Sequence, residues 1–210
     1  MREIVKDIQA WILSFFIALF IVFLLKTFIG MPTKIKGDSM YPTLVSKERI
    51  ILSTWKATFN KVPDRGDCIT FEAPSLNSKH YGDTINPIAF YDENNKNFMD
   101  KVLYDVLGIT SSSYIKRVIG LPGEHVEIKD GKVYINGTEL EEDYLQDGVV
   151  TDILHGGRYT DVLVPDGCVY VLGDNRSASS DSRTFGCIPI NKIEGKAWIR
   201  WWPFEKFGIL

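Results

Sequence analysis

The chain has 210 residues, of which 45% are hydrophobic and 24% charged, and these proportions are those of a globular protein, not a disordered one. Its net charge of −3 argues against binding nucleic acid through bulk positive charge, so we expect no nucleic-acid partner. The three cysteines and three histidines are too few and too dispersed for a disulfide scaffold or a zinc site, and we expect neither metal nor cofactor. Whether Cys168 and Cys187 pair is left open.

The most distinctive segment is the uncharged run 8–25, IQAWILSFFIALFIVFLL. As a helix it would be about 27 Å long, close to the thickness of a bilayer's hydrocarbon core. A buried soluble helix is one alternative, but a domain this small rarely contains a helix that is apolar on every face. A cleaved signal peptide is another, but no small-x-small pattern follows the run. We therefore predict a retained membrane anchor in residues 1–32.

Residues 33–210 read as one β-rich domain. Short runs of Val, Ile and Tyr alternate with Gly, Pro, Asn and Asp, which indicates strands and tight turns. Within a small subdomain at 124–166, Asp-Gly at 130–131 and Asn-Gly at 136–137 favour two-residue hairpin turns and predict a three-stranded meander. Further strands are predicted at 49–53, 67–72, 114–120, 161–164, 168–172 and 195–201.

Residues 73–113 differ from their surroundings, since they are rich in Asn and Ser and poor in β-branched residues. We interpret them as an insertion between two core strands, with one short helix near 98–107, where apolar residues recur at helical spacing. A surface loop and a flap over the substrate are both compatible with this pattern.

Three segments carry residues suited to chemistry: 37–44 (GDSMYPTL), 114–123 (YIKRVIGLPG) and 173–183 (GDNRSASSDSR). A fourth, shorter segment is 65–71 (RGDCITF). Taken singly, each has a structural explanation as a turn or as the solvent-facing part of a strand.

The strand around Lys116 and Arg117 weakens that explanation, because it is apolar on both faces and side chains alternate between faces. One of the two cations is therefore expected in apolar surroundings. Desolvation lowers the pKa of a lysine, and a neutral amine can act as general base on a serine hydroxyl. None of the three histidines lies in a comparable segment, and Ser39 lacks the Gly-x-Ser-x-Gly pattern of a hydrolase nucleophile elbow.

Together, these four segments, in this order and behind an apolar span, resemble the bacterial type I signal peptidases, in particular the single-span form of Gram-positive bacteria. The resemblance covers about residues 8–72 and 114–200. It implies that Ser39 is the nucleophile, Lys116 the general base and Ser179 a serine that orients the lysine amine. It also implies a structural ion pair between Asp181 and Arg183. Asp174 and Arg176 are expected to hold the same turn.

The implied fold is mainly β, an antiparallel, barrel-like catalytic domain behind an N-terminal transmembrane helix. The implied reaction is removal of signal peptides from exported preproteins through an acyl-enzyme, on the extracytoplasmic side of the cell membrane, by a monomer. The backbone N–H of Ser39 is the expected oxyanion donor. Some family members add a serine hydroxyl two residues earlier, but this chain has Gly37 there. The second donor is therefore not identified.

Ile35, Tyr114 and Ile115 are the candidates for lining the substrate subsites, with core packing as the alternative. The aromatic residues near the C-terminus are candidates for contact with the lipid bilayer: Trp198, Trp201, Trp202, Phe204 and Phe207. Two other functions are considered. A self-cleaving Ser–Lys peptidase would need a DNA-binding or partner domain, and a catalytically inactive binding domain would not need Ser39, Lys116 and Ser179 together.

Overall fold

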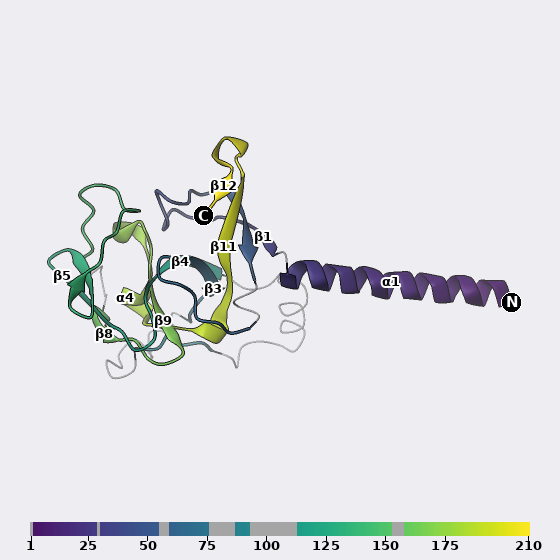
Figure 1. Ribbon diagram of the computed structural model, residues 1–210, viewed down its shortest axis with the longest axis horizontal. Coiled ribbons are helices and arrows are strands. Elements are labelled where there is room, and N and C mark those ends of the chain that lie inside the picture. Colours follow the sequence, from purple (N-terminus) through teal and green to yellow (C-terminus); the bar gives the residue numbers. More distant parts are fainter. Residues whose placement is uncertain (1, 29, 55–58, 76–86, 93–112, 153–157) are drawn as a thin grey trace.

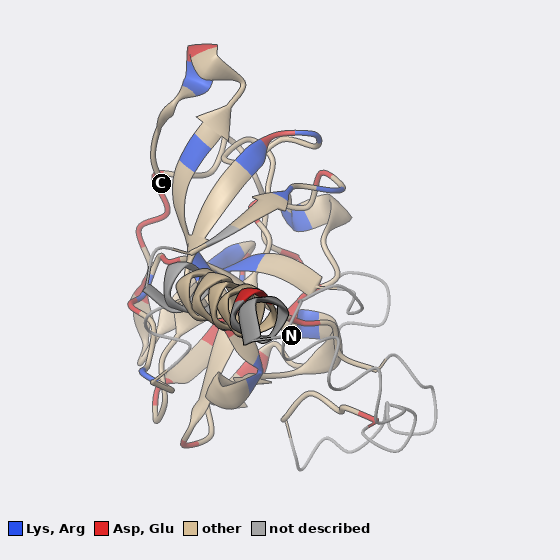
Figure 2. Ribbon diagram, turned by 90° about the vertical axis from the view of Figure 1, so that its right-hand side faces the viewer, with Lys and Arg blue, Asp and Glu red and all other residues tan. Residues whose placement is uncertain are grey.

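The computed structural model describes residues 2–28, 30–54, 59–75, 87–92, 113–152 and 158–210. The chain begins with helix α1 (Arg2–Phe28), which projects as a rod from a β-rich body (Figure 1). Every side chain described on α1, from residue 7 to residue 22, is exposed, and Asp7 is the one charged residue in this range. The described part of the helix accordingly shows almost no charge when viewed near its axis (Figure 2). Among the described residues, no helix combines the length and the apolar character needed to cross a membrane.

The larger sheet is antiparallel and holds most of the segments singled out in the sequence. Its strands follow the order β1-β2-β11-β3-β4-β9-β10, with β12 paired to β11. Of the described strands, β1 and β10 lie at its two ends. The bounds are β1 (Met31–Lys34), β2 (Arg49–Ser53), β3 (Cys68–Glu72), β4 (Ser113–Gly120), β9 (Cys168–Leu172), β10 (Ile188–Pro189), β11 (Ile193–Trp202) and β12 (Gly208–Ile209). The strands predicted in these regions are confirmed: β2 and β9 have the predicted bounds, and the ends of β3, β4 and β11 differ by at most two residues.

The smaller sheet has the order β7-β6-β5-β8. Its strands are β5 (His125–Lys129), β6 (Lys132–Ile135), β7 (Thr138–Glu139) and β8 (Asp161–Leu163). Asp130, Gly131, Asn136 and Gly137 all have positive φ, between 51° and 80°, as two-residue primed turns require. The predicted meander is therefore confirmed, and β8 pairs with β5 as its fourth strand.

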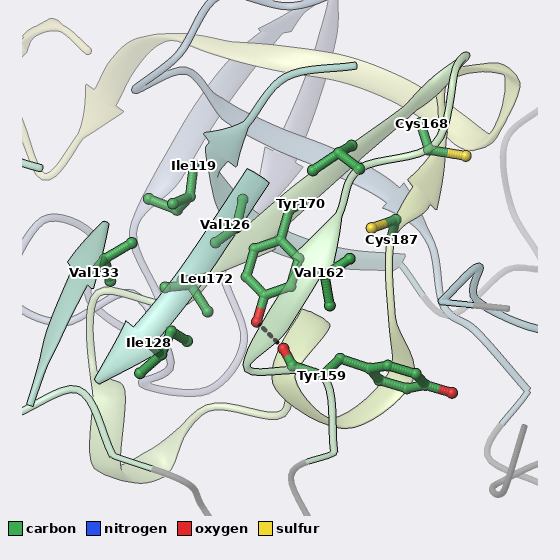
Figure 3. Close-up of a cluster of buried hydrophobic side chains, with 11 residues drawn as sticks. Ile119, Val126, Ile128, Val133, Tyr159, Val162, Cys168, Tyr170, Leu172 and Cys187 are labelled. Carbon is green, nitrogen blue, oxygen red and sulfur yellow. Dashed lines mark hydrogen bonds between the residues drawn. The ribbon is translucent and has the colours of Figure 1, made fainter. Parts of the chain in front are cut away.

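The apolar core between the two sheets is shown in Figure 3. Val126 and Ile128 of β5 pack there with Tyr170 of β9, whose hydroxyl donates a hydrogen bond of 2.6 Å to the Tyr159 carbonyl. Cys168 and Cys187 are buried in this core as free thiols. The question of their pairing, left open by the sequence, is answered by the structure: they form no disulfide.

A second core fixes the segment that contains Ser39. Met40 and Leu44 are fully buried beside Ile35, Ile50 and Leu52. Packing of these two side chains into the core holds the turns between β1 and β2 in place. The remaining helical elements are short: η2 (Arg176–Ala178), α4 (Ser182–Phe185), η3 (Ile190–Lys192) and η4 (Phe204–Lys206).

The predicted insertion at 73–113 falls mostly outside the described residues, and so does the helix predicted near 98–107. The described stretch 87–92 contacts the body, where Ile88 forms an isolated bridge with Cys187.

Candidate active site

Ser39 and Lys116 lie together although they are 77 positions apart in the sequence. Lys116 is in the middle of β4, and Ser39 is in the turn that follows Gly37. The Lys116 Nζ atom is 2.7 Å from the Ser39 Oγ atom. This separation is that of a good hydrogen bond, so a neutral amine at this position can accept the proton of the hydroxyl.

Lys116 is almost completely buried, with 4% of its surface exposed. Burial is the largest effect on its pKa and lowers it from 10.5 to about 8. Asp181 and Asp174 oppose this effect at longer range, and Arg183 reinforces it. Among the described residues, no carboxylate forms an ion pair with Lys116, so none of them acts as a counter-ion that holds the amine in its charged form.

The neighbouring Arg117 is also buried but has a counter-ion. Its Nε and Nη2 atoms donate hydrogen bonds of 2.8 and 2.6 Å to the two carboxylate oxygens of Asp174. It also donates to the Gly66 carbonyl and the Thr43 hydroxyl. The structure thereby identifies Lys116 as the cation in apolar surroundings. It also gives the segment 65–71 a structural role, because the Gly66 carbonyl accepts a hydrogen bond from Arg117.

The segment 173–183 lies against the Ser39 turn. The Asn175 backbone N–H donates to the Ser39 carbonyl at 3.0 Å, and the Asn175 side-chain amide donates to the Asp38 carbonyl at 3.1 Å. These two bonds fix the backbone on which the Ser39 side chain is carried. Asn175 was not singled out from the sequence, since an Asn in a Gly-Asp-Asn-Arg turn is usually explained by the turn itself.

Ser179 is buried in the same region, and its Oγ atom has no hydrogen-bond partner among the described residues. The hydrogen bond to Lys116 that the resemblance implies is therefore not formed in this structure. The side chain occupies the space that Gly173 leaves open, because a Cβ added at Gly173 would lie 2.1 Å from Ser179 Oγ and 2.5 Å from the Ser39 carbonyl oxygen. An unpartnered buried hydroxyl costs about 1–3 kcal/mol. Ser179 thus offers an unused hydrogen-bonding group beside Ser39.

Asp181 and Arg183 form a fully buried ion pair, with the Arg183 Nε and Nη2 atoms each 2.8 Å from a carboxylate oxygen. Asp181 also accepts hydrogen bonds from the backbone N–H groups of Gly173 and Arg183. The pair therefore connects the beginning of the segment to helix α4.

Asp174 and Arg176 both belong to this turn but do not pair with each other. Asp174 binds Arg117, whereas Arg176 binds Glu142 and the Thr151 hydroxyl. Sequence reasoning did not single out Glu142, because it stands in the acidic run Glu-Glu-Asp at 141–143, which is typical of a solvated loop.

The three residues predicted to line subsites lie near the candidate pair but are not equally accessible. Ile35 is 3% exposed and belongs to the core beneath the Ser39 turn, and Ile115 is partly buried against the same core. Tyr114 is partly buried, packs its ring against Phe71, and lies with its ring centre 5.5 Å from Lys116 Nζ. In the described part of the chain, no group of three His, Cys, Asp or Glu side chains is arranged to hold a metal ion.

Residues 8–202 match the family described as signal peptidase, peptidase S26. The chain belongs to this family. It is 33% identical over 215 aligned positions to signal peptidase IB of Staphylococcus aureus strain COL, covering 96% of this chain and 93% of the relative. It is 35% identical over 196 positions to a probable signal peptidase I-1 of Synechocystis, covering 92% of this chain and 82% of the relative.

The crystal structure of a signal peptidase I from Enterococcus faecalis is 29% identical, covers 64% of this chain and 95% of that one, and has a TM-score of 0.39. Membership of family S26 makes the chain a serine peptidase of the signal peptidase I type. Every candidate site residue lies within the matched range 8–202.

Proposed function

We propose that this peptidase removes N-terminal signal peptides from exported preproteins, with Ser39 as nucleophile and Lys116 as general base. The observation that carries the proposal is the 2.7 Å contact between Ser39 Oγ and a buried Lys116 amine whose pKa is lowered to about 8. A lysine with its ordinary pKa would be protonated at neutral pH and unable to accept a proton.

The reaction begins when neutral Lys116 accepts the Ser39 hydroxyl proton while Ser39 Oγ attacks the scissile carbonyl carbon. The Ser39 N–H, which donates no hydrogen bond within the described part of the chain, stabilises the oxyanion. Lys116 then donates its proton to the leaving amine, and the peptide bond breaks. In deacylation, Lys116 accepts a proton from water, the resulting hydroxide attacks the ester, and the proton returns to Ser39 Oγ.

Ser179 supports this cycle as a partner for the lysine. Its buried hydroxyl lies beside the Ser39 carbonyl and has no partner in the described residues. When Lys116 turns from Ser39 after proton transfer, Ser179 Oγ accepts a hydrogen bond from the resulting ammonium group. Asp181 and Arg183 keep the Ser179 segment in place.

The substrate binds as an extended strand along β4. Strand β4 pairs with β3 from Ser113 to Arg117 but with β9 only from Arg117 onward. The edge of residues 113–116 that faces away from β3 is therefore without a strand partner among the described residues, and it ends at Lys116. A peptide that pairs with this edge gains main-chain hydrogen bonds and places its scissile bond near Ser39. Tyr114 and Ile115, which are partly exposed, line shallow apolar subsites for the small residues of the signal peptide, and the buried Ile35 supports them from the core.

Residues 1–32 anchor the enzyme in the cell membrane as a single pass, with the β-rich domain 33–210 on the extracytoplasmic side. The supports for this proposal are the uncharged run 8–25 and the exposure of the apolar side chains from Ile8 to Val22 on a helix that projects from the body (Figure 1). Anchoring holds the active site at the surface that delivers the signal peptide and raises the effective substrate concentration. A monomer contains the complete Ser39–Lys116 pair.

The C-terminal end of the larger sheet provides a second contact with the bilayer. Four apolar side chains there are 41–67% exposed: Trp198, Trp202, Phe204 and Phe207. Trp201, by contrast, is partly buried beneath the Arg49 guanidinium. Lys34 of β1, Arg49 of β2 and Trp202 of β11 are consecutive cross-strand partners, so two exposed cations adjoin the aromatic group. Aromatic rings and cations together suit the headgroup layer of an anionic bilayer.

The test is cleavage of a synthetic preprotein by the full-length enzyme in detergent, with the cut site read by mass spectrometry. We expect Ser39→Ala and Lys116→Ala each to abolish cleavage, while the exposed Ser180→Ala and Lys129→Ala variants retain it. Normal cleavage by Lys116→Ala would show that Lys116 is not the base. Normal cleavage by Ser39→Ala would refute the proposed nucleophile.

A further inference from the structure

Three arginine–carboxylate pairs hold the segment 173–183 in place. In one of them the carboxylate comes from a distant part of the chain. Asp174 pairs with Arg117 and Asp181 pairs with Arg183. The third arginine, Arg176, is 1% exposed and pairs with Glu142, which follows the small sheet and has only 10% of its side chain exposed. The loop that follows β7 therefore contributes an ionic contact to the segment that fixes the Ser39 turn.

Glu142 uses both carboxylate oxygens in this contact. Arg176 Nη1 donates to Oε2 at 3.0 Å, and Arg176 Nη2 donates to Oε1, which also accepts the Tyr144 hydroxyl. The same arginine donates through Nε to the Gly173 carbonyl at 3.1 Å. A buried guanidinium that loses its carboxylate has to move toward water or acquire a new partner. Either change would pull on the backbone of Gly173, next to Asp174 and Asn175.

Tyr144 makes a second contact of a different kind. Its ring lies 3.9 Å from the Arg117 guanidinium carbon, within the range of a favourable cation–π interaction. Arg117 precedes Val118 on β4, follows Lys116 directly, and binds Asp174 on its other side. Thus Glu142 acts on the segment that holds Ser39, and Tyr144 acts on the strand residue next to Lys116.

We propose that Glu142 and Tyr144 are positioning residues for the Ser39–Lys116 pair. Through Arg176 and Arg117 they fix the Asn175 amide groups that hold the Asp38 and Ser39 carbonyls. Glu142 contacts Arg176 and Tyr144 contacts Arg117, so we expect their effect to be on the geometry of the reacting groups and not on binding of the peptide. The loop that follows β7 thereby takes part in catalysis, a role that goes beyond the proposed function but rests on it.

The decisive measurement is the separation of kcat and KM for preprotein cleavage by full-length variants in detergent. Misplacement of reacting groups by about 1 Å lowers the rate about 100-fold. We expect Glu142→Gln to lower kcat about 10- to 100-fold with KM within twofold of the parent value. We expect Tyr144→Phe, which keeps the ring over Arg117, to lose less kcat than Tyr144→Leu, which removes it.

Matched controls come from the small sheet that precedes this loop. Glu139 forms an exposed ion pair with Lys132, and Tyr134 has the Lys129 amine 4.7 Å from its ring centre. Glu139→Gln and Tyr134→Leu should therefore leave kcat unchanged. We also expect the double variant Glu142→Gln with Arg176→Gln to lose less kcat than the two single variants together. The losses are compared on a logarithmic scale, and the shortfall is expected because the two side chains act as one unit.

The proposal is overturned if Glu142→Gln and Tyr144→Leu, both folded by circular dichroism, keep the parent kcat, or if they raise KM alone. It is also overturned if the two control variants lose as much kcat as the test variants. Should Glu142→Gln fail to fold, the comparison of Tyr144→Phe with Tyr144→Leu decides the matter. These results are separate from the proposed function, which fails only if Ser39→Ala or Lys116→Ala cleaves normally.

Discussion

Arg117 and Asp174 form a bidentate ion pair of 2.6 and 2.8 Å in the interior, immediately beside the lysine whose pKa is lowered. The pair gives the buried Arg117 its counter-ion. Burial of the Lys116 amine outweighs the opposing effects of Asp181 and Asp174 and lowers its pKa to about 8. The arrangement leaves a single amine available for proton transfer at near-neutral pH.

The pH dependence of kcat/KM should follow the ionisation of Lys116. Because the neutral amine is the reactive form and its pKa is about 8, kcat/KM should rise with pH and level off above pH 8. At pH 6, kcat/KM should be about 100-fold below the plateau, and a plot of log(kcat/KM) against pH should have a slope of one below pH 8. A profile that is flat from pH 6 to pH 9 would contradict the assignment of Lys116 as base.

Lys116 should also lower the stability of the fold. The pKa falls from 10.5 in the unfolded chain to about 8 in the folded protein, so the unfolded state binds more protons between these values. The cost is fully present below pH 8, fades as the pH rises to 10.5, and amounts to about 3 kcal/mol. Lys116→Met should therefore be inactive yet more stable at pH 7, with the gain shrinking at pH 10.

Urea unfolding at the two pH values measures this effect. The exposed Lys129→Met variant is the control and should show no comparable gain. A Lys116→Met variant that is less stable than the parent at pH 7 would contradict the prediction.

Asp174→Asn should destabilise the protein, because it leaves the Arg117 guanidinium buried without a counter-ion. Breaking a buried pair by removing one partner costs about 3–5 kcal/mol. The matched control is Asp161→Asn, since Asp161 is 73% exposed and pairs with His125 at the surface. Its loss should be within about 1 kcal/mol. Equal losses for the two variants, measured by urea unfolding, would refute this reading of Arg117.

Gly173→Ala should abolish activity even though it adds only one methyl group. The added carbon would lie 2.5 Å from the Ser39 carbonyl oxygen and 2.1 Å from Ser179 Oγ, so both candidate site residues must move. Combining it with Ser179→Ala should not restore cleavage, because the clash with the Ser39 backbone remains. Gly208→Ala, where a Cβ would meet nothing within 4 Å, is the control for cleavage and should be active.

Membrane contact by the C-terminal aromatic group is tested with a fragment that lacks residues 1–32. Replacing Trp202 and Phe204, whose rings pack edge-to-face at 5.0 Å, by Ser should reduce binding to anionic liposomes several-fold. Cleavage of a short soluble peptide should not change, because neither residue contacts the Ser39–Lys116 pair. Undiminished binding of the double variant to liposomes would rule out this contact.

The hairpin turns and the family could be predicted from the order of residues alone. The hairpins at 130–131 and 136–137 were predictable, because Asp-Gly and Asn-Gly tolerate the positive φ that short turns need. The segments containing Ser39, Lys116 and Ser179 were recognisable as short motifs in a fixed order. The alternation of side chains on β4 also showed that one of two adjacent cations would lie in apolar surroundings.

Which of the two cations is buried without a counter-ion, and what surrounds it, depends on contacts between segments that are distant in the chain. Lys116 has the lowered pKa because folding buries its amine, whereas the adjacent Arg117 pairs with Asp174, which lies 57 positions away in the sequence. Glu142 could not be distinguished from its acidic neighbours, since burial of a charge depends on a partner that folding brings from Arg176, 34 positions away. Charged side chains pair with partners that are close in space, and a local pattern of residues does not show which distant residue that partner is.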